Sequence, residues 1–213
     1  MKRTLLTLLL AVIFITGCET PSDLLIDPVN TSENSINEII IEGGIYTYKF
    51  MPLPPKSPLW QDSVLTMSQA IDGETGGQLI MEKYYISLDG DSIQIWADLR
   101  VPPGAFQGTK TITITVDDEF AALHFYPKMA FQDTLKLTRG FKGLDLTNCT
   151  NGNVDFIFID DDGTIEIIKK NGLQVIKPQG IVRVYNAKLL HFSRYGWVRK
   201  IFHPGFNNNI NHE

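Results

Sequence analysis

This chain of 213 residues contains few of the residues that many functional sites require, and each shortage removes a class of function. Only two cysteines are present, Cys18 and Cys149, and neither they nor the four histidines show zinc-ligand spacing. Clusters of Lys and Arg are also missing, and the formal net charge is −5. Nucleic acid is therefore not an expected partner, because its phosphates require grouped cations. No metal and no other cofactor is indicated.

The short motifs of common enzymes are missing as well. The chain has no Gly-x-Ser-x-Gly elbow, no glycine-rich phosphate loop and no His-Glu pair of a zinc protease. The run Asp160–Asp162 before Gly163 lacks the alternating acidic positions of a calcium loop, so we interpret it as a solvated hairpin turn. We therefore expect no enzyme that acts on a diffusible substrate.

The one long apolar run stands at the start of the chain. Lys2 and Arg3 form a basic head, Leu5–Ile15 is almost wholly apolar, and a small residue follows, as in a secretory signal peptide. The residues Ile15-Thr16-Gly17-Cys18 resemble the lipobox of bacterial lipoproteins. The resemblance implies cleavage between Gly17 and Cys18, a lipid on Cys18, and a place in the bacterial cell envelope.

This interpretation sets the expected location and partners. The apolar run is shorter than the ~20 residues that span a bilayer, so attachment would depend on the lipid. We expect a protein anchored in the outer membrane through acylated Cys18. The sequence does not decide between the periplasmic and the surface face of that membrane. An envelope protein or a glycan is a further expected partner. Cys149 then has no disulfide partner and is expected to be a small buried residue.

The mature chain divides by composition into a polar start, a long β-rich region and a polar end. Residues 18–38 are rich in Ser, Thr, Asn, Asp and Pro, and four prolines follow between Pro52 and Pro58, where they would form a linker or a strap across the domain. The expected organisation is a signal peptide over 1–17, a lipidated tether and Pro-rich linker over 18–59, a β-sandwich over 60–203 and a disordered tail over 204–213.

Strand patterns dominate the long region. Thr111–Val116 alternates Thr with Ile and Val, which is the period of a half-buried antiparallel strand. Val154–Phe158 and Ile165–Ile167 flank a glycine-containing loop and predict a hairpin. Turn signals recur every 8–12 residues and no amphipathic helix is apparent. The fold class predicted is an all-β, antiparallel β-sandwich.

One series of segments resembles the ZU-type domain, named for zonula occludens proteins and netrin receptors. Gly76-Gly77-Gln78-Leu79 opens a strand, Val101-Pro102-Pro103-Gly104-Ala105 makes a turn, and His124-Phe125-Tyr126-Pro127 and Leu135–Thr138 follow. The resemblance covers roughly residues 76–195 and implies a ZU-type β-sandwich. Independently of the family, two prolines followed by a glycine favour a tight reversal between strands.

The tripeptide His191-Phe192-Ser193 has two interpretations. Some ZU-type domains cut themselves between Phe and Ser of this tripeptide. The resemblance implies that Ser193 would attack the Phe192 carbonyl, that His191 would take its proton, and that water would hydrolyse the ester. The alternative is a terminal core strand over Leu189–Trp197, in which Phe192 is buried and His191 and Ser193 share the opposite face.

Aromatic residues supply a last candidate site. Trp and Tyr side chains could form a platform for a sugar or peptide, or could lie in the core. Tyr84 and Tyr85 must face opposite sides of a strand, so one of them is expected to be exposed. The candidate residues are Trp60, Trp96, Trp197, Tyr84 and Tyr85.

Together these patterns predict a lipid-anchored cell-envelope protein whose β-sandwich is a non-catalytic structural or binding module. Two alternatives stay open. One is a domain that cuts its own Phe192–Ser193 bond once, and the other is a carbohydrate- or peptide-binding module.

Overall fold

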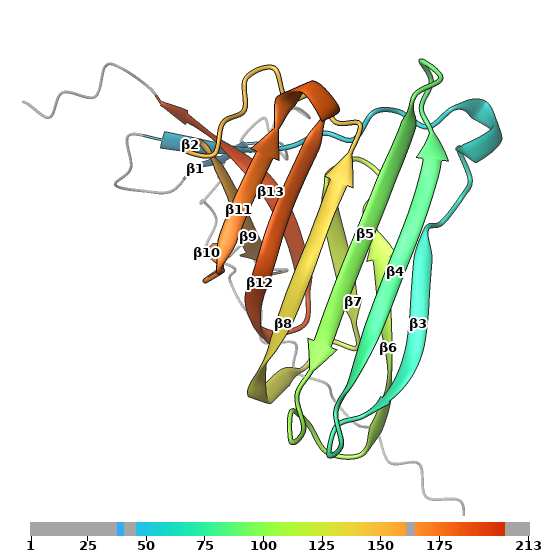
Figure 1. Ribbon diagram of the computed structural model, residues 1–213, viewed down its shortest axis with the longest axis vertical. Helices are drawn as coiled ribbons and strands as arrows, with labels where there is room; N and C mark the ends of the chain where they lie inside the picture. Colours follow the sequence, from blue (N-terminus) through green and yellow to red (C-terminus); the bar gives the residue numbers. More distant parts are fainter. Residues whose placement is uncertain (1–37, 41–45, 161–164, 203–213) are drawn as a thin grey trace, which may run out of the picture. The chain divides into compact units, whose positions relative to one another are not determined.

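The computed structural model describes residues 38–40, 46–160 and 165–202, and it is built of strands (Figure 1). Two antiparallel sheets pack face to face, which confirms the predicted β-sandwich. The only helical turns in the described ranges are the two 3₁₀ helices η1 (Pro58–Trp60) and η2 (Lys177–Gln179). The predicted signal peptide, the first part of the tether and the tail lie outside the described residues.

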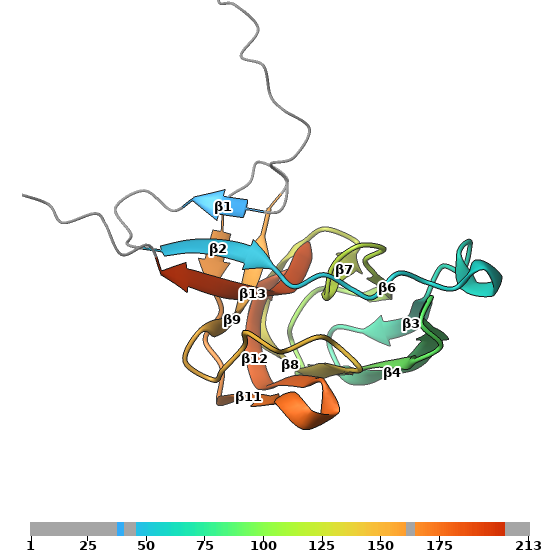
Figure 2. The same ribbon diagram turned by 90° about the horizontal axis from the view of Figure 1, so that it is seen from above.

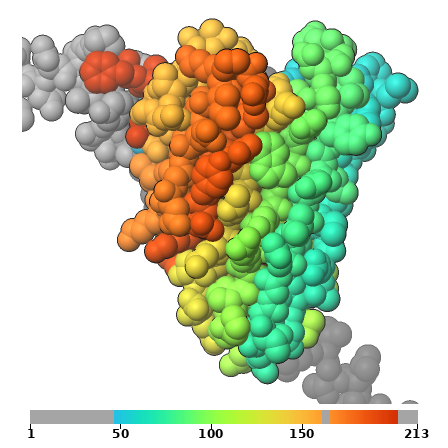
Figure 3. Space-filling view, in the orientation of Figure 1, coloured from blue at the N-terminus to red at the C-terminus, as the bar shows by residue number. Residues whose placement is uncertain are grey.

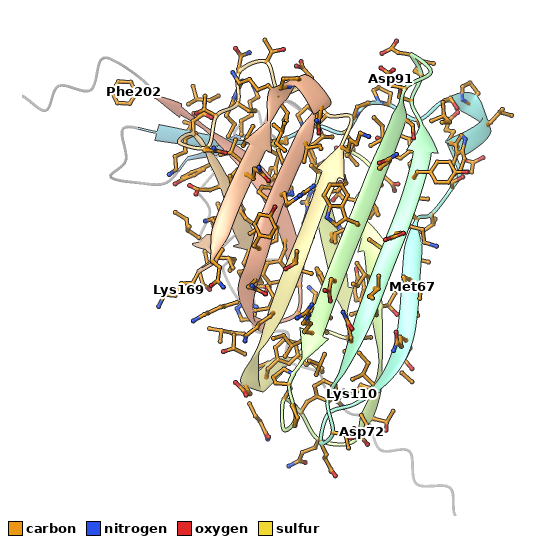
Figure 4. The ribbon with its side chains drawn as sticks, in the orientation of Figure 1. Met67, Asp72, Asp91, Lys110, Lys169 and Phe202 are labelled. Atoms are coloured by element: carbon orange, nitrogen blue, oxygen red, sulfur yellow. The ribbon has the colours of Figure 1, made fainter. Side chains whose placement is uncertain are left out.

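The five-stranded sheet faces the viewer in Figure 1. Its strands are long, and β8 runs through its middle. Asp91, in the turn that joins β4 to β5, and Asp72 lie at opposite ends of the long strands (Figure 4). The order across the sheet is β11 (Gly172–Ile176), β12 (Ile181–His191), β8 (Ala130–Lys142), β5 (Ser92–Val101) and β4 (Gly77–Ile86).

The eight-stranded sheet lies behind it. Its long central strand, β13 (Arg194–Phe202), pairs with β7 and β2 along one edge and with β9 along the other. The main path runs β1 (Glu38–Ile40), β2 (Tyr46–Phe50), β13, β7 (Ala122–Tyr126), β6 (Thr109–Val116) and β3 (Thr66–Asp72), with β9 (Val154–Ile159) on β13 and β10 (Ile165–Ile167) on β9.

Side-chain alternation builds the core between the sheets. On β6, Ile112, Ile114 and Val116 are buried, as the Thr/Ile pattern predicts, while the threonines face outward. Each such apolar side chain contributes roughly 1.5–3 kcal/mol when it leaves water. The predicted hairpin also forms, because β9 pairs with β10. The Pro-Pro-Gly turn joins β5 to β6 with Gly104 at a φ of 81°. A glycine takes this left-handed conformation without strain.

The Pro-rich segment is a strap across the sandwich, and the domain therefore begins earlier in the chain than predicted. Met51 and Leu53 donate backbone hydrogen bonds to Trp197 and Glu119 on the eight-stranded side, at 3.0 and 2.7 Å. Farther along, Leu88 of the β4–β5 turn donates to Pro55 at 2.7 Å. Figure 2 shows this segment crossing between the sheets. The predicted boundary at residue 60 is therefore too late. Composition places β2 in the tether, whereas its hydrogen bonds to β13 place it in the sheet.

An arginine lies in the apolar interior. Arg139 points inward from β8, is fully buried, and donates hydrogen bonds to the carbonyl oxygens of Tyr195 at 3.1 Å and Ala121 at 3.3 Å. Its guanidinium also stacks over Phe141 and Phe156. Burial lowers the pKa of Arg139 to about 9, which leaves it charged at neutral pH. This side chain joins the two sheets through polar contacts as well as packing.

Candidate functional site: the outer face of the five-stranded sheet

A tryptophan lies flat on the outer face of the five-stranded sheet. Trp96 alternates with the buried Ile95 and Ala97 on β5, so its ring points outward. The facing residue on β8 is Gly140, and a Cβ there would collide with the Trp96 ring. The glycine therefore provides the space in which the indole rests on the backbone, and the Trp96 side chain stays partly exposed.

A polar chain extends from this ring across β12 and β11. The Arg183 guanidinium stands 5.3 Å from the Trp96 ring centre, in cation–π geometry. Arg183 Nη1 donates to the Tyr185 hydroxyl at 3.1 Å, and that hydroxyl donates to Gln174 Oε1 at 3.1 Å. These bonds hold Arg183 in place beside the ring, so the pair is organised before any ligand arrives.

On the other side of Trp96, an exposed tyrosine borders a hollow. Tyr84 on β4 is 55% exposed, and its ring centre is 5.4 Å from that of Trp60 in η1. The hollow has a volume of about 510 Å³, and Glu82 and Gln94 line it between Tyr84 and Trp96. Aromatic faces and planar hydrogen-bonding groups thus alternate along one open surface, which we call the platform. Figure 3 looks directly onto it.

Three of the five aromatic residues proposed from the sequence belong to this surface, and two do not. Trp60, Trp96 and Tyr84 lie at the platform or its rim, whereas Trp197 and Tyr85 are fully buried. Tyr85 faces inward because it alternates with the exposed Tyr84, as predicted, and burial raises the pKa of its hydroxyl. Sequence reasoning did not select Arg183, Gln94 or Gly140. Strand alternation predicts that the side chains of the first two point outward. The role of Gly140 depends on the neighbouring strand, so the local sequence does not indicate it.

The tripeptide His191-Phe192-Ser193 forms a corner where the chain passes from one sheet to the other. β12 ends at His191 and β13 begins at Arg194, so the expectation of one continuous strand over Leu189–Trp197 is wrong. Phe192 is buried, as that interpretation predicted, and its ring contacts Phe125 and Phe131. Ser193 is buried as well, and its hydroxyl contacts the end of β9.

His191 and Ser193 have separate partners. Ser193 Oγ donates to the Ile159 carbonyl at 3.3 Å. The His191 ring packs on Phe158, and its Nε2 lies 3.9 Å from a carboxylate oxygen of Glu166. Tyr195 donates its hydroxyl to the His191 carbonyl at 2.5 Å, and burial raises the pKa of that hydroxyl. This arrangement satisfies both residues structurally, and self-cleavage at Phe192–Ser193 stays the alternative that a mass measurement tests.

A second polar cluster stabilises the eight-stranded sheet. Asp117 accepts hydrogen bonds from His124 at 3.0 Å and from Arg194 at 2.8 Å, and its other oxygen accepts the backbone N–H groups of Glu119 and Phe120. Burial raises the pKa of Asp117, but the His124 bond, the two N–H groups and Arg194 together outweigh burial and lower it to about 2. The hollow beside this cluster measures about 410 Å³. We assign the cluster a structural role, because its charges satisfy one another.

The remaining predicted features divide between described and undescribed residues. Gly17 and Cys18, the predicted cleavage and lipidation sites, lie outside the described residues, as do Asp161–Gly163. Cys149 is buried, as predicted, and burial raises the pKa of its thiol. In the described ranges, no cluster of three His, Cys, Asp or Glu side chains could hold a metal ion. Nor does any helix there have the length and apolarity needed to cross a membrane.

Comparison with known proteins adds no relative: no protein-family model, curated protein or solved structure matches this chain. The resemblance to ZU-type domains therefore stays a prediction, although its Gly-Gly motif begins β4 and its Pro-Pro-Gly turn follows β5, side by side at the open end of one hairpin.

Proposed function

We propose that this protein is a lipid-anchored component of the bacterial cell envelope, and that its β-sandwich is a non-catalytic module that binds carbohydrate on the platform. The observation that carries the proposal is the Trp96 ring, seated on Gly140 and fixed beside Arg183 on an open sheet face. A pyranose has a face of C–H groups that suits an aromatic ring, and a rim of hydroxyls that suits Gln, Glu and Arg.

The platform fits a sugar chain better than a peptide strand. A peptide added to a sheet uses the unpaired backbone of an edge strand. Trp96 and Arg183 instead stand on inner strands of the five-stranded sheet, whose backbone groups are already paired on both sides. Binding there must depend on side chains alone, and planar polar side chains around a ring supply the hydrogen bonds that sugar hydroxyls need.

The test is a binding measurement with detergent-solubilised, full-length protein against a panel of soluble polysaccharides. Trp96→Ala should weaken binding at least about tenfold, since loss of a central aromatic contact typically costs about 2 kcal/mol or more. Phe202→Ala is the matched control, because Phe202 is an exposed aromatic on β13 of the other sheet (Figure 4). Equal binding by Trp96→Ala and the wild type would contradict the platform as the site.

The anchor is tested separately by cell fractionation. Cys18→Ser should move the protein out of the membrane fraction and leave an unprocessed precursor, because the acylated cysteine is the proposed attachment. A variant that stays membrane-bound and is processed normally would contradict lipid anchoring without bearing on the platform.

A further inference from the structure

Cations form a continuous row across the lower part of the same sheet face. Lys136 on β8 pairs in register with Arg100 on β5 and with Lys188 on β12, so three cationic side chains stand opposite one another on adjacent strands. The Lys188 N–H donates to the Lys169 carbonyl at 2.8 Å, which brings a fourth lysine to the edge of the row (Figure 4). We call Arg100, Lys136 and Lys188 the cationic row.

This arrangement is costly unless an anion is nearby. Like charges placed directly opposite in a sheet destabilise it. Arg100 is paired with Asp98 at 3.1 Å, but among the described residues no carboxylate lies within ion-pair distance of Lys136 or Lys188. The concentration of positive charge is also local, because the whole chain has 24 acidic and 19 basic side chains. Lys136 and Lys188 therefore provide positive charge that no described carboxylate balances at this place.

A hollow beside the row carries the groups that would recognise an anionic sugar. Its volume is about 350 Å³, and Arg100, Lys136, Thr134, Asn171 and Asn186 line it. Asn186 stands in a bulge of β12, with a φ of 47°, and its N–H donates to Thr138 Oγ1 at 3.1 Å. Bulges commonly redirect a side chain next to a binding site. Here the bulge brings an amide, which both donates and accepts, next to two cations.

The hollow and the platform ring lie on one path. Trp96 and Arg100 point outward from the same strand, four residues apart, which is about 13 Å along β5. A short oligosaccharide spans this distance, so one chain can contact the ring with one unit and the cationic row with another. A free inorganic anion would bind the cationic row but would make no stacking contact with the Trp96 ring.

We infer that the ligand of the platform is an acidic glycan, a sugar chain whose carboxylate, phosphate or sulfate groups bind the cationic row while a sugar ring stacks on Trp96. This inference rests on the proposed function and specifies its ligand. Each new charge-assisted hydrogen bond between the acidic group and the cationic row strengthens binding. An acidic polymer should therefore bind at least about tenfold more tightly than its neutral counterpart, by the usual conversion of free energy to affinity.

The experiment uses two matched pairs of polymers with full-length protein in detergent. One pair is a polyuronate and the same polymer with its carboxylates reduced, and the other is dextran sulfate and dextran. Lys136→Gln/Lys188→Gln should lower affinity for the preferred acidic polymer to the level of its neutral partner and leave neutral binding unchanged. Lys49→Gln/Lys110→Gln, which removes two cations from the other sheet, is the control and should change neither.

The outcomes separate the two proposals. Preference for the acidic member of either pair supports the inference and identifies the anionic group. Equal binding of acidic and neutral members, unaffected by the double lysine variant, overturns the inference but leaves carbohydrate binding in place. Polyglutamate that binds as tightly as the acidic polysaccharides, with no effect of Trp96→Ala, would also overturn it, because binding would then need charge alone. Failure of every polysaccharide to bind contradicts the proposed function, and the inference falls with it.

Discussion

The Trp96 ring occupies the space above Gly140 in which a side chain of the next strand would otherwise stand. The two residues are register partners on β5 and β8, so the ring lies across the middle of the five-stranded sheet and rests on backbone. An aromatic ring held in this way has its orientation set by the sheet and loses little freedom when a ligand stacks on it. The pair Trp96–Gly140 is therefore the structural basis of the proposed binding face.

The first prediction concerns Gly140→Ala. A Cβ at this position would collide with the Trp96 ring and would stand 2.6 Å from the Val182 carbonyl oxygen. The ring should be displaced, and overpacking should cost about 1–3 kcal/mol of stability. Denaturant titration checks the stability, and polysaccharide affinity should fall as it does for Trp96→Ala. Unchanged stability together with unchanged binding would show that the ring does not need this seat.

The second prediction concerns the buried Arg139. Arg139→Ala removes two inter-sheet hydrogen bonds and the guanidinium that stacks on Phe141 and Phe156, and it leaves a cavity. We expect a loss of about 3–5 kcal/mol, measured by the denaturation midpoint. Arg139→Met is the matched variant, because it fills similar space without a charge to desolvate, and it should be clearly more stable than Arg139→Ala. The reverse order would mean that the volume filled by the side chain does not determine stability here.

The third prediction is the acid sensitivity that Asp117 confers. Its pKa is about 2 in the folded chain, below the ordinary value of 3.8. The ionised form is favoured in the folded state, so its contribution is complete above pH 3.8 and is lost as the pH falls toward 2. Across that window the wild type should lose about 1–2 kcal/mol that Asp117→Asn does not lose. Parallel stability curves for the two proteins between pH 4 and pH 2 would contradict this assignment.

The fourth prediction concerns the corner at His191-Phe192-Ser193. Because Ser193 Oγ donates to the Ile159 carbonyl and His191 contacts Phe158 and Glu166, we expect the chain to stay uncut. Intact mass after long incubation at several pH values measures this directly. A fragment that ends at Phe192, absent in Ser193→Ala, would instead establish the self-processing alternative.

Local sequence patterns predict much of this fold because side-chain alternation is a local property. Thr111–Val116 shows which face of β6 is buried, and Val154–Phe158 and Ile165–Ile167 predict the β9–β10 hairpin. Composition alone indicates a tether for β2, because its place in the sheet depends on β13, about 150 residues away in the chain. The corner after His191 was missed because the apolar pattern continues through it while the chain changes sheets.

The candidate site was partly predictable for the same reason. Alternation on β5 sets Trp96 opposite to Ile95 and Ala97, so its outward direction is present in the sequence. Whether an outward ring is useful depends on its neighbours, and those come from strands far apart in the chain: Gly140 on β8 and Arg183 on β12. The cationic row likewise arises from strand register. Its residues are far apart in the sequence, so no run of basic residues predicts it.

The central claim is that Trp96 contacts a sugar. The chain has three tryptophans: Trp197 is fully buried and serves as the internal reference, and Trp60 lies at the rim of the platform beside Tyr84. The most direct measurement is a titration of ¹⁵N-tryptophan-labelled protein with the polysaccharides of the binding panel, following the three indole N–H signals by NMR. We predict that the Trp96 signal shifts saturably while the Trp197 signal stays fixed. A Trp96 signal that stays unchanged throughout the panel would contradict the account.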